Sequence, residues 1–315
     1  MTTPEVVTFG EALGSIRASG MLRHGGAMVL SLGGAESNVA IGLARLGHRA
    51  RWVGRLGSDE IGALALRTLR AENVAIDQVT IDDARPTGVM LVEKRVGDVS
   101  RVAYYRAASV GSALATNDLR DAFDAQTRVL HLTGITPALS ASAAEATRWA
   151  ARRARELGVM VSLDVNYRAA LWGRDEASTV LAELAALATV VFASDDELSL
   201  VAGGENEEDA VEQLRAAGVS EVVVKRGADG ATAWSASGRQ SVPARVVPVV
   251  DTIGAGDAFT AGYLSALLDE EPIGERLNRG AVLGAFAVSG SGDWERLPTR
   301  AELTLLDRAS GHTIR

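Results

Sequence analysis

The sequence predicts an α/β protein: a mainly parallel, doubly wound sheet with helices on both faces and a small lid of extra strands. Three observations support this class. Short apolar runs alternate with helical patterns over most of the 315 residues, and two stretches with a period of two residues interrupt that alternation. No apolar run approaches the roughly 18 residues that a membrane span needs. We therefore expect a parallel sheet covered by helices.

Six short runs, most of them rich in valine, are expected to form the buried strands. Strands covered on both faces of a parallel sheet are apolar along their length, and these runs have that character. The predicted strands are residues 6–9, 51–54, 129–133, 159–164, 190–193 and 221–225.

Segments with a helical period of apolar residues lie between these strands. Gly47 and Gly218 follow two of them, as expected where a glycine ends a helix. The predicted helices are residues 36–46, 59–71, 140–157, 175–187 and 207–217, and the apolar period beyond Asp257 predicts a further helix that starts there.

Residues 12–32 and 87–106 break the alternation and read as inserted β structure. The second stretch contains TGVMLVEKRV and SRVAYYR on either side of an expected turn at Gly97 and Asp98. Ligands of such sheets lie outside the carboxyl ends of the strands, so strands inserted there are expected to form a lid. We expect residues 1–315 to form one domain that includes this lid.

The composition excludes several kinds of site. The absence of cysteine rules out disulfides, thiolate zinc sites and cysteine nucleophiles. Only Lys94 and Lys225 are lysines, and neither follows a glycine, so no Walker A sequence is present. The GxGxxG, GxSxG and HExxH signatures are absent too.

A formal net charge of −8 argues against broad binding to nucleic acid, whose phosphates need a basic surface. The N-terminal MTTPEVVTFGEAL has no basic region, and Glu5, Gly10 and Glu11 interrupt its apolar run, so it reads as a first strand and not as a signal peptide. We expect a cytoplasmic protein with neither a nucleic-acid nor a membrane partner.

The segment Asp251-Thr-Ile-Gly-Ala-Gly-Asp257 precedes an apolar helical pattern. Gly254 and Gly256 permit a tight turn with free backbone N–H groups at a helix N-terminus, which favours binding of an anion. Asp257 could accept a proton from a hydroxyl while those groups hold a transferring phosphoryl group. The alternative is an acidic residue that only complements the helix dipole.

A second segment, Gly33-Gly34-Ala35-Glu36-Ser37-Asn38, leads into the first helix. Its paired glycines let backbone approach a ligand, and Asn38 offers a donor and an acceptor to neighbouring hydroxyls. The alternative is an ordinary turn.

Together, and about 220 residues apart in this order, the two segments resemble the two signatures of the ribokinase/PfkB family of carbohydrate kinases. The resemblance covers essentially the whole chain, including the lid. It implies a ribokinase-like three-layer α/β/α core and Mg²⁺-dependent transfer of phosphate from ATP to a sugar-like hydroxyl. Asp257 would then be the catalytic base, and Gly254, Ala255 and Gly256 would form the anion hole.

Four further runs indicate which members of this family the chain resembles most. They are YYR at 104–106, HLTGITPALS at 131–140, SLDVNYR at 162–168 and VKRG at 224–227. They are similar to those of 2-keto-3-deoxygluconate kinases. The resemblance implies that the positions matching Gly34, Tyr104, Arg106, Arg168, Asp257 and Asp293 contact the substrate, and we add Gly33, Asn38 and Asn166. A sugar acid needs a carboxylate partner, which arginine provides. As alternatives, Tyr104 and Arg106 belong to an amphipathic strand, and Arg168 pairs with Asp164 or Asp175.

The resemblance also implies a nucleotide side. Ser194 and Glu197 stand where the wider family has an Asn-x-x-Glu motif associated with magnesium and phosphate, so Glu197 is expected to act on the metal through water. The alternative is the opening turn of a helix, DDELSLVAGG. Lys225 and the glycines of the following loop, Gly227 and Gly230, match the family's ATP-binding loop.

Two positions depart from the pattern. Met90 stands where some 2-keto-3-deoxygluconate kinases have a substrate-contacting tyrosine, and Ala281 stands where some have an asparagine near the adenine. The four histidines, which show no ligand spacing, are expected to be structural: His24, His48, His131 and His312.

The leading hypothesis is a kinase that phosphorylates the primary hydroxyl of 2-keto-3-deoxygluconate. Its rival is a kinase of the same family for a neutral sugar such as fructose or ribose, or for a nucleoside. A sensor that keeps the fold without catalysis is a third hypothesis, which the intact Asp257 opposes. The exposed edges of the lid strands predict a homo-oligomer. The sequence leaves open the choice between gluco and galacto epimers of the acid.

Overall fold

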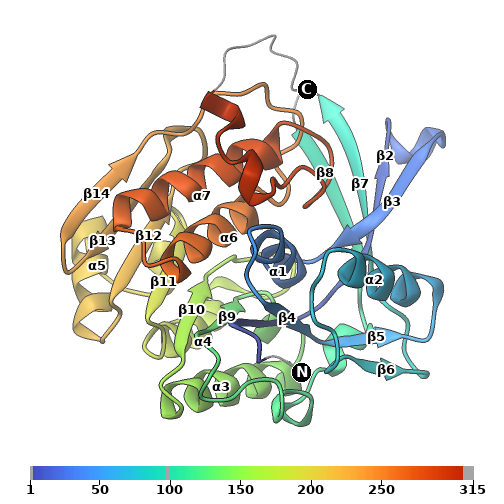
Figure 1. The fold of residues 1–315 in the computed structure, drawn as a ribbon. Helices are drawn as coiled ribbons and strands as arrows, with labels where there is room; N and C mark the ends of the chain where they lie inside the picture. Colours follow the sequence, from blue (N-terminus) through green and yellow to red (C-terminus); the bar gives the residue numbers. More distant parts are fainter. Residues whose placement is uncertain (1–2, 97–98, 308–315) are drawn as a thin grey trace.

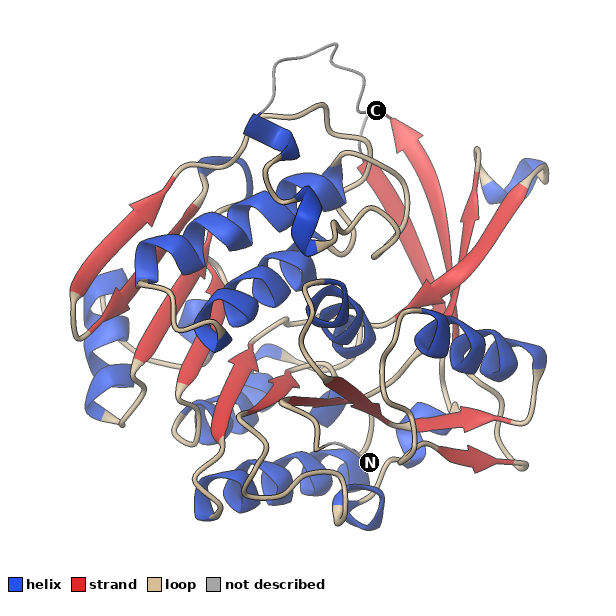
Figure 2. Cartoon of the chain, viewed as in Figure 1, coloured by secondary structure: helices blue, strands red, loops and turns tan. Residues whose placement is uncertain are grey.

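The computed structural model describes residues 3–96 and 99–307 and shows the predicted α/β class (Figures 1 and 2). Its large sheet has eight strands in the order β14-β13-β12-β11-β10-β9-β1-β4. Strands β4, β1, β9, β10, β11 and β12 are parallel, whereas β13 and β14 extend the sheet as an antiparallel hairpin. The bounds are β1 (Val6–Phe9), β4 (Ala50–Val53), β9 (Val129–Thr133), β10 (Met160–Asp164), β11 (Val190–Ser194), β12 (Glu221–Lys225), β13 (Ala231–Ser235) and β14 (Gly238–Val242).

Helices cover both faces of this sheet. The helices are α1 (Ala35–Arg45), α2 (Glu60–Ala71), α3 (Ala141–Glu156), α4 (Arg174–Ala185), α5 (Glu207–Ala216), α6 (Ala255–Leu268) and α7 (Ile273–Val288). Short 3-10 helices are η1 (Leu22–His24), η2 (Val110–Ala113), η3 (Thr116–Leu119), η4 (Thr136–Ala138), η5 (Leu198–Leu200), η6 (Gly227–Asp229), η7 (Arg300–Glu302) and η8 (Leu305–Asp307). None of the helices in the described residues combines the length and apolar character needed to cross a membrane.

Two apolar cores lie on opposite faces of the sheet because successive strand residues point to opposite sides. Val191 packs with α3, α4 and α5 in one core. Its neighbours Val190 and Phe192 pack with α1, α6 and α7 in the other. The valine-rich runs therefore supply both cores, which gives the three layers.

The local signals that predicted the helices are used in the structure. The side chain of Asp59 caps α2 by accepting the Gly62 N–H at 2.7 Å, and Ser140 caps α3 by accepting the Ala143 N–H at 3.1 Å. Most predicted boundaries agree within one or two residues. The helix expected to start at Asp257 starts at Ala255, so Asp257 lies in its first turn.

The two interrupting stretches form a separate four-stranded sheet in the order β3-β2-β7-β8. Its strands are β2 (Leu13–Ala18), β3 (Met28–Gly33), β7 (Val89–Val96) and β8 (Val99–Tyr105), and they project away from the large sheet in Figure 1. The expected turn at 97–98 lies outside the described residues. A small parallel pair, β5 (Arg55–Gly57) and β6 (Thr80–Asp82), was not predicted. We call the four-stranded sheet the lid sheet.

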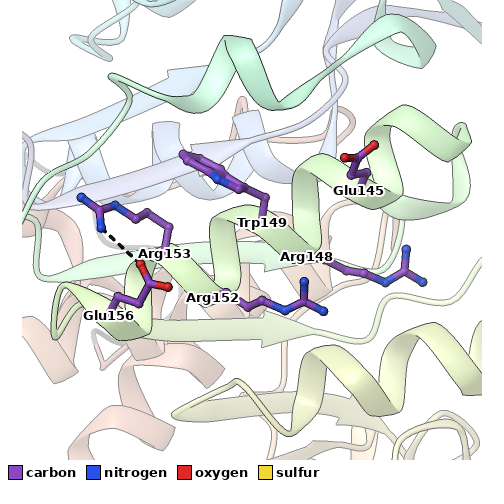
Figure 3. Close-up of a pocket in the computed structure, with 6 residues that line it drawn as sticks. All are labelled: Glu145, Arg148, Trp149, Arg152, Arg153 and Glu156. Carbon is purple, nitrogen blue, oxygen red and sulfur yellow. Dashed lines mark hydrogen bonds and ion pairs between the residues drawn. The ribbon is translucent and has the colours of Figure 1, made fainter.

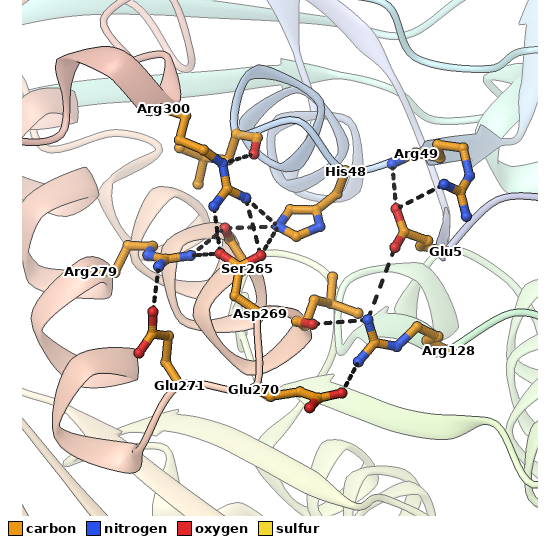
Figure 4. A network of polar contacts seen from close by, with 12 residues as sticks. Glu5, His48, Arg49, Arg128, Ser265, Asp269, Glu270, Glu271, Arg279 and Arg300 are labelled. Atoms are coloured by element: carbon orange, nitrogen blue, oxygen red, sulfur yellow. Dashed lines mark hydrogen bonds and ion pairs between the residues drawn. The ribbon is translucent and has the colours of Figure 1, made fainter.

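An ion-pair network joins α6, α7 and the segment after α1 (Figure 4). Asp269 accepts hydrogen bonds from Arg279 at 2.5 Å and Arg300 at 2.6 Å, and His48 bonds to Ser265 at 2.9 Å. His48 thus has the structural role that was predicted. His131 is buried in β9 against Ser162, His24 lies exposed in η1, and His312 lies outside the described residues.

Candidate active site

The predicted site residues meet at the carboxyl end of the parallel strands. Asn166 follows β10, Ser194 ends β11 and Lys225 ends β12, while the first turns of α1 and α6 bring Asn38 and Asp257 to the same edge. Parallel strands present their carboxyl ends on one edge of the sheet, which explains how segments more than 200 residues apart converge.

Asp257 is the centre of this cluster and is buried. Asn38 Nδ2 donates to its Oδ2 at 2.8 Å, and Asn166 Nδ2 donates to its Oδ1 at 3.2 Å. Burial raises the pKa of Asp257 above its usual range, although the Asn38 hydrogen bond and the charges of Arg168 and Lys225 oppose that rise. A carboxylate held by two amides with a raised pKa is suited to accept a proton near neutral pH.

The turn before Asp257 has the backbone features that an anion site requires. Gly254 has φ +82°, and a Cβ at this position would lie 2.2 Å from the Asp293 carbonyl oxygen, so only glycine fits. Within the described residues, the N–H groups of Gly254, Gly256 and Asp257 have no acceptor. Free N–H groups at the start of α6 favour an anion.

Lys225 faces this turn from β12. Its Nζ lies 2.6 Å from Asp164 Oδ2, which also accepts the Thr260 hydroxyl at 3.0 Å, and a Cβ on Gly256 would lie 3.5 Å from Nζ. Asp164 therefore pairs with Lys225 and not with Arg168. Arg168 is exposed, and in the described part of the chain it forms no ion pair, so both structural alternatives for this arginine are wrong.

The paired glycines lie where β3 meets α1. Gly34 has φ +141°, and a Cβ there would lie 2.5 Å from the Glu11 carbonyl oxygen. A Cβ on Gly33 would lie 2.8 Å from the Met90 methyl group and 3.1 Å from Asp293 Oδ2. The missing side chain of Gly33 thus lets Met90 and Asp293 lie close to the backbone of β3.

Two buried amide oxygens beside Asp257 have no partner. Asn38 and Asn166 use their Nδ2 groups on Asp257, which leaves Oδ1 of each without a donor among the described residues. Buried acceptors are rarely left unpaired, so these two oxygens are candidates to accept hydroxyl groups of a ligand. Asn166 has φ +39°, a left-handed conformation that asparagine tolerates and that often occurs at functional sites.

Arg106 and Tyr104 lie at the end of lid strand β8. The guanidinium lies 5.2 Å from the centre of the Tyr104 ring, and Nη2 lies 2.5 Å from Glu11 Oε2. Arg106 Nε is buried without a partner in the described residues. Sequence reasoning missed Glu11 as the partner, although a charged residue interrupting the first apolar run was a signal for it.

The comparisons with known proteins agree with this geometry. A family model described as pfkB family carbohydrate kinase matches residues 3–300. The chain belongs to the pfkB family of carbohydrate kinases. The kinase is 37% identical over 306 residues to the 2-dehydro-3-deoxygluconokinase of Bacillus subtilis (strain 168), which covers 95% of this chain and 94% of the relative.

Solved structures give the same fold for the kinase. The PfkB protein from Polaromonas sp. JS666 superposes with a TM-score of 0.86 at 37% identity, covering 96% of this chain and 99% of that one. Aminoimidazole riboside kinase from Salmonella enterica, solved with aminoimidazole riboside and an ATP analog, has a TM-score of 0.82 at 30% identity and covers 96% and 99%. The expected ribokinase-like fold is confirmed.

On the nucleotide side of the kinase, Glu197 anchors two loops. Its carboxylate accepts the Tyr167 N–H at 2.7 Å and the Ser194 N–H at 2.9 Å. The segment that could have opened a helix forms only the 3-10 helix η5. Among the described residues no group of three or more His, Asp or Glu could hold a metal by itself, so a magnesium ion here would depend on water and phosphate.

The two predicted glycines after β12 differ. Gly227 has φ +54° and open space around its Cα, whereas a Cβ on Gly230 would lie 2.1 Å from the Val242 carbonyl oxygen. Gly230 is therefore required by the packing of β13 against the chain beyond β14. Gly227 has no such packing constraint in the described residues, so of the pair it is the better candidate for a ligand contact.

Glu36 is a further buried carboxyl group that sequence reasoning did not assign. It lies in the first turn of α1, where its Oε1 accepts the hydroxyls of Thr133 at 2.5 Å and Thr136 at 2.7 Å. Burial raises its pKa to about 7, against the opposing effect of the threonine hydrogen bonds and with a smaller contribution from Asp257. The amino end of α1 thus carries a group that titrates near neutrality.

The pocket in Figure 3 lies elsewhere, on the outer face of α3. It has a volume of about 280 Å³ and is lined by Glu145, Arg148, Trp149, Arg152, Arg153 and Glu156. Arg153 already pairs with Glu156, and none of the lining residues belongs to the predicted site. This pocket is therefore separate from the candidate site at the edge of the sheet.

Proposed function

We propose that this kinase transfers the γ-phosphoryl group of Mg·ATP to the primary hydroxyl of 2-keto-3-deoxygluconate. The observation that carries the reaction type is the placement of Asp257 between two amide donors, directly after a turn with free N–H groups. The identity of the acid is supported by the 37% identical 2-dehydro-3-deoxygluconokinase.

Different residues of the chain act on the two sides of the phosphoryl transfer. The hydroxyl proton moves to Asp257, the hydroxyl oxygen forms the new bond to phosphorus, and the bond between the γ-phosphorus and the leaving nucleotide breaks. The N–H groups of Gly254, Gly256 and Asp257, which flank Ala255, stabilise the charge on the phosphoryl oxygens. Lys225 adds a positive point charge on the same side.

The residues present fit a nucleotide with its metal. The unpaired N–H groups of the 254–257 turn and the ammonium of Lys225 are the groups that phosphate oxygens require. When bound, Mg·ATP supplies the phosphoryl group, and its metal neutralises charge. We assign Gly227 and Ser194 to the rim of this nucleotide site and Glu197 to a water-mediated contact with the metal. Gly230 supports the loop through packing.

The sugar side is formed by the groups that have no protein partner. The Oδ1 atoms of Asn38 and Asn166 would accept the sugar hydroxyls, with the bare backbone of Gly33 and Gly34 and the carboxylate of Asp293 beside them. Arg106, Arg168 and the Tyr104 ring would bind the carboxylate end of the sugar acid. Two arginines suit an anionic substrate better than a neutral sugar.

The direct test is a coupled assay of purified kinase with ATP and a panel of substrates. The panel contains 2-keto-3-deoxygluconate, its galacto epimer, fructose, ribose and a riboside. A kcat/KM at least about a hundredfold higher for one of the acids than for every neutral sugar would support the proposal, since two charge-assisted contacts of this kind contribute roughly 3 kcal/mol or more. Preference for a neutral sugar or riboside would overturn it.

We also infer that two copies of the chain associate through their lid sheets. Strand β3 is an edge of the lid sheet and exposes Met28, Val29 and Leu30, with Val29 66% exposed. An edge strand with apolar residues is a template for pairing with a second copy. Val29→Glu should shift the mass measured by light scattering toward the monomer, and an unchanged mass would exclude this interface.

Within this proposal, residues 1–315 act as one catalytic unit in which the lid sheet closes over the sugar. A cytoplasmic location follows from the same proposal because Mg·ATP is the cosubstrate. Fusion of the chain to a fluorescent protein would test the location.

A further inference from the structure

A buried arginine of the lid sheet reaches two carboxylates of the core. Arg17 lies on β2, is 8% exposed, and donates through Nη1 to Asp251 and through Nη2 to Asp293. Asp251 and Asp293 are both buried as well. Ser15, two residues earlier on the same strand, donates its hydroxyl to Asp293 Oδ1 at 3.3 Å.

Both carboxylates belong to the frame of the phosphoryl-binding turn. Asp251 begins the motif and accepts the Ile253 N–H at 3.1 Å, directly before Gly254. Asp293 packs its carbonyl oxygen against Gly254, where a Cβ would come within 2.2 Å. One guanidinium therefore joins the two chain segments that hold Gly254 in its left-handed conformation.

A second lid residue reaches the same segment. Lys94 on β7 donates to the Val250 carbonyl oxygen at 2.7 Å, directly before Asp251. Strands β2 and β7 are neighbours in the lid sheet. Both polar side chains thus tie the lid to the amino end of the turn, and of the two Arg17 is buried whereas Lys94 is exposed.

We propose that Arg17 is a positioning residue that couples the lid sheet to the 251–257 turn. With β2 in place, its planar guanidinium holds Asp251 and Asp293 together and keeps the N–H groups of Gly254, Gly256 and Asp257 aligned for the phosphoryl group. Without it, two buried carboxylates face each other beside the anion site, where they repel both one another and the phosphates. This inference rests on the proposed role of the turn.

The decisive variant is Arg17→Lys, which keeps the positive charge but lacks the two nitrogens in a fixed plane that hold the two carboxylates apart and in place. We expect kcat to fall at least about tenfold, because misaligned anion-hole donors lose much of their effect, while the KM for the sugar acid changes less than about threefold. Hydrogen exchange followed by mass spectrometry should show faster exchange in the 252–257 segment through its two hydrogen-bonded amides, those of Ile253 and Ala255, with the 221–225 amides of β12 unchanged.

Arg276→Lys is the matched control. Arg276 is a half-buried arginine of α7 that pairs with Glu221 at 2.5 Å, remote from the turn. It should lower thermal stability without changing kcat or the exchange of the turn. A kcat of Arg17→Lys within about twofold of the parent, or unchanged exchange at 252–257, would overturn the coupling.

If Arg17→Lys does not fold, Asp251→Asn gives the same decision. It keeps the pairing of Arg17 with Asp293 but removes the charged partner at position 251. Faster exchange at 252–257 and a lower kcat are again expected. Exchange and kcat equal to those of the parent would contradict the inference. Because exchange is measured without substrate, it judges the coupling even if the turn proves to bind something other than a phosphoryl group.

Discussion

The guanidinium of Arg106 lies 2.5 Å from the carboxylate of Glu11, at the place where the lid sheet joins the core. Glu11 follows β1 of the core, and Arg106 follows β8 of the lid. Ser109 donates to the second oxygen of Glu11 at 2.5 Å, and Gly88 and Gly111 leave the space that this carboxylate fills. Glu11 therefore holds the Nη2 side of the guanidinium, and Nε is left without a partner among the described residues.

The pairing makes a prediction about substrate charge. Arg106→Ala should raise the KM for a sugar acid about tenfold or more while changing the KM for ATP little, since a charge-assisted hydrogen bond contributes about 1.5 to 3 kcal/mol. Glu11→Gln should raise the same KM by a smaller factor, because the arginine is less well held. Steady-state kinetics with the acid as the varied substrate measures both.

A double-mutant cycle separates positioning from general damage. Once Arg106 is absent, Glu11→Gln should have no further effect on the KM for the acid, because its effect acts through Arg106. Independent, additive effects of the two substitutions would show that Glu11 acts otherwise.

The hydrogen bond from Asn38 to Asp257 predicts a shift in the pH dependence of turnover. The base must be deprotonated, so kcat/KM rises as pH passes upward through the pKa of Asp257. Asn38 lowers that pKa, and Asn38→Ala should therefore move the acid limb of the profile to higher pH. The pH–rate profile of the variant checks this.

Asp257→Asn is the companion variant. It removes the titrating group, so turnover should be lost while thermal stabilisation by the sugar acid is retained. Turnover that survives in Asp257→Asn, or an acid limb that does not move in Asn38→Ala, would contradict the assignment of the base.

Glu36 predicts a pH-dependent stability. The pKa of Glu36 is about 7 in the folded chain, whereas its reference value, taken for the unfolded chain, is 4.5. Between these two pH values the folded chain therefore binds more protons than the unfolded chain does. The free energy of unfolding should fall as pH rises through this window, by about 3 kcal/mol from this group alone. In Glu36→Gln this contribution is absent. The stability difference between variant and parent should thus move in favour of the variant from about pH 5 to about pH 8 in urea titrations.

A constant offset between the two chains across that range would contradict the assigned pKa. The offset itself is not decisive, because glutamine keeps an oxygen for Thr133 and Thr136 but adds an amide that needs a partner of its own.

The six parallel strands were predictable because their residues are buried on both faces and therefore carry an apolar signal. Strands β13 and β14 were missed: β13 is buried, but its sequence ATAWS mixes small and hydroxyl side chains, and β14 is a mostly exposed edge strand with the polar sequence GRQSV. The pair β5 and β6 was missed because three residues are too few for any period to be visible.

Some residues of the candidate site were predictable and others were not. Asp257, Asn38 and the glycines were predictable because each lies in a short segment whose sequence determines its own local geometry. Glu11, Arg17, Asp164 and Glu36 were not assigned, because each acts through a partner that only the tertiary fold supplies. Arg17 and Asp251, for example, are 234 residues apart in the chain.

Lys225 is one of two lysines among 32 basic residues, and the structure explains why arginine is not equivalent here. Its compact ammonium lies between Asp164 and the bare backbone of Gly256. A planar guanidinium would bind the Asp164 carboxylate through two donors and fill the space over the glycine. Lys225→Arg should therefore lower kcat by about tenfold or more and raise the KM for ATP, with little change in melting temperature.

Arg226→Lys, the reverse exchange at the next residue, is the matched control. The Arg226 side chain pairs with Glu207 and Asp195 and bonds to Thr232. It should cost some stability and leave kcat unchanged, since none of these partners faces the turn. If Lys225→Arg keeps the parent's kcat and KM for ATP, the ammonium is not a phosphate ligand, and the lysine is then required only to neutralise the buried Asp164, a role that arginine can also fill.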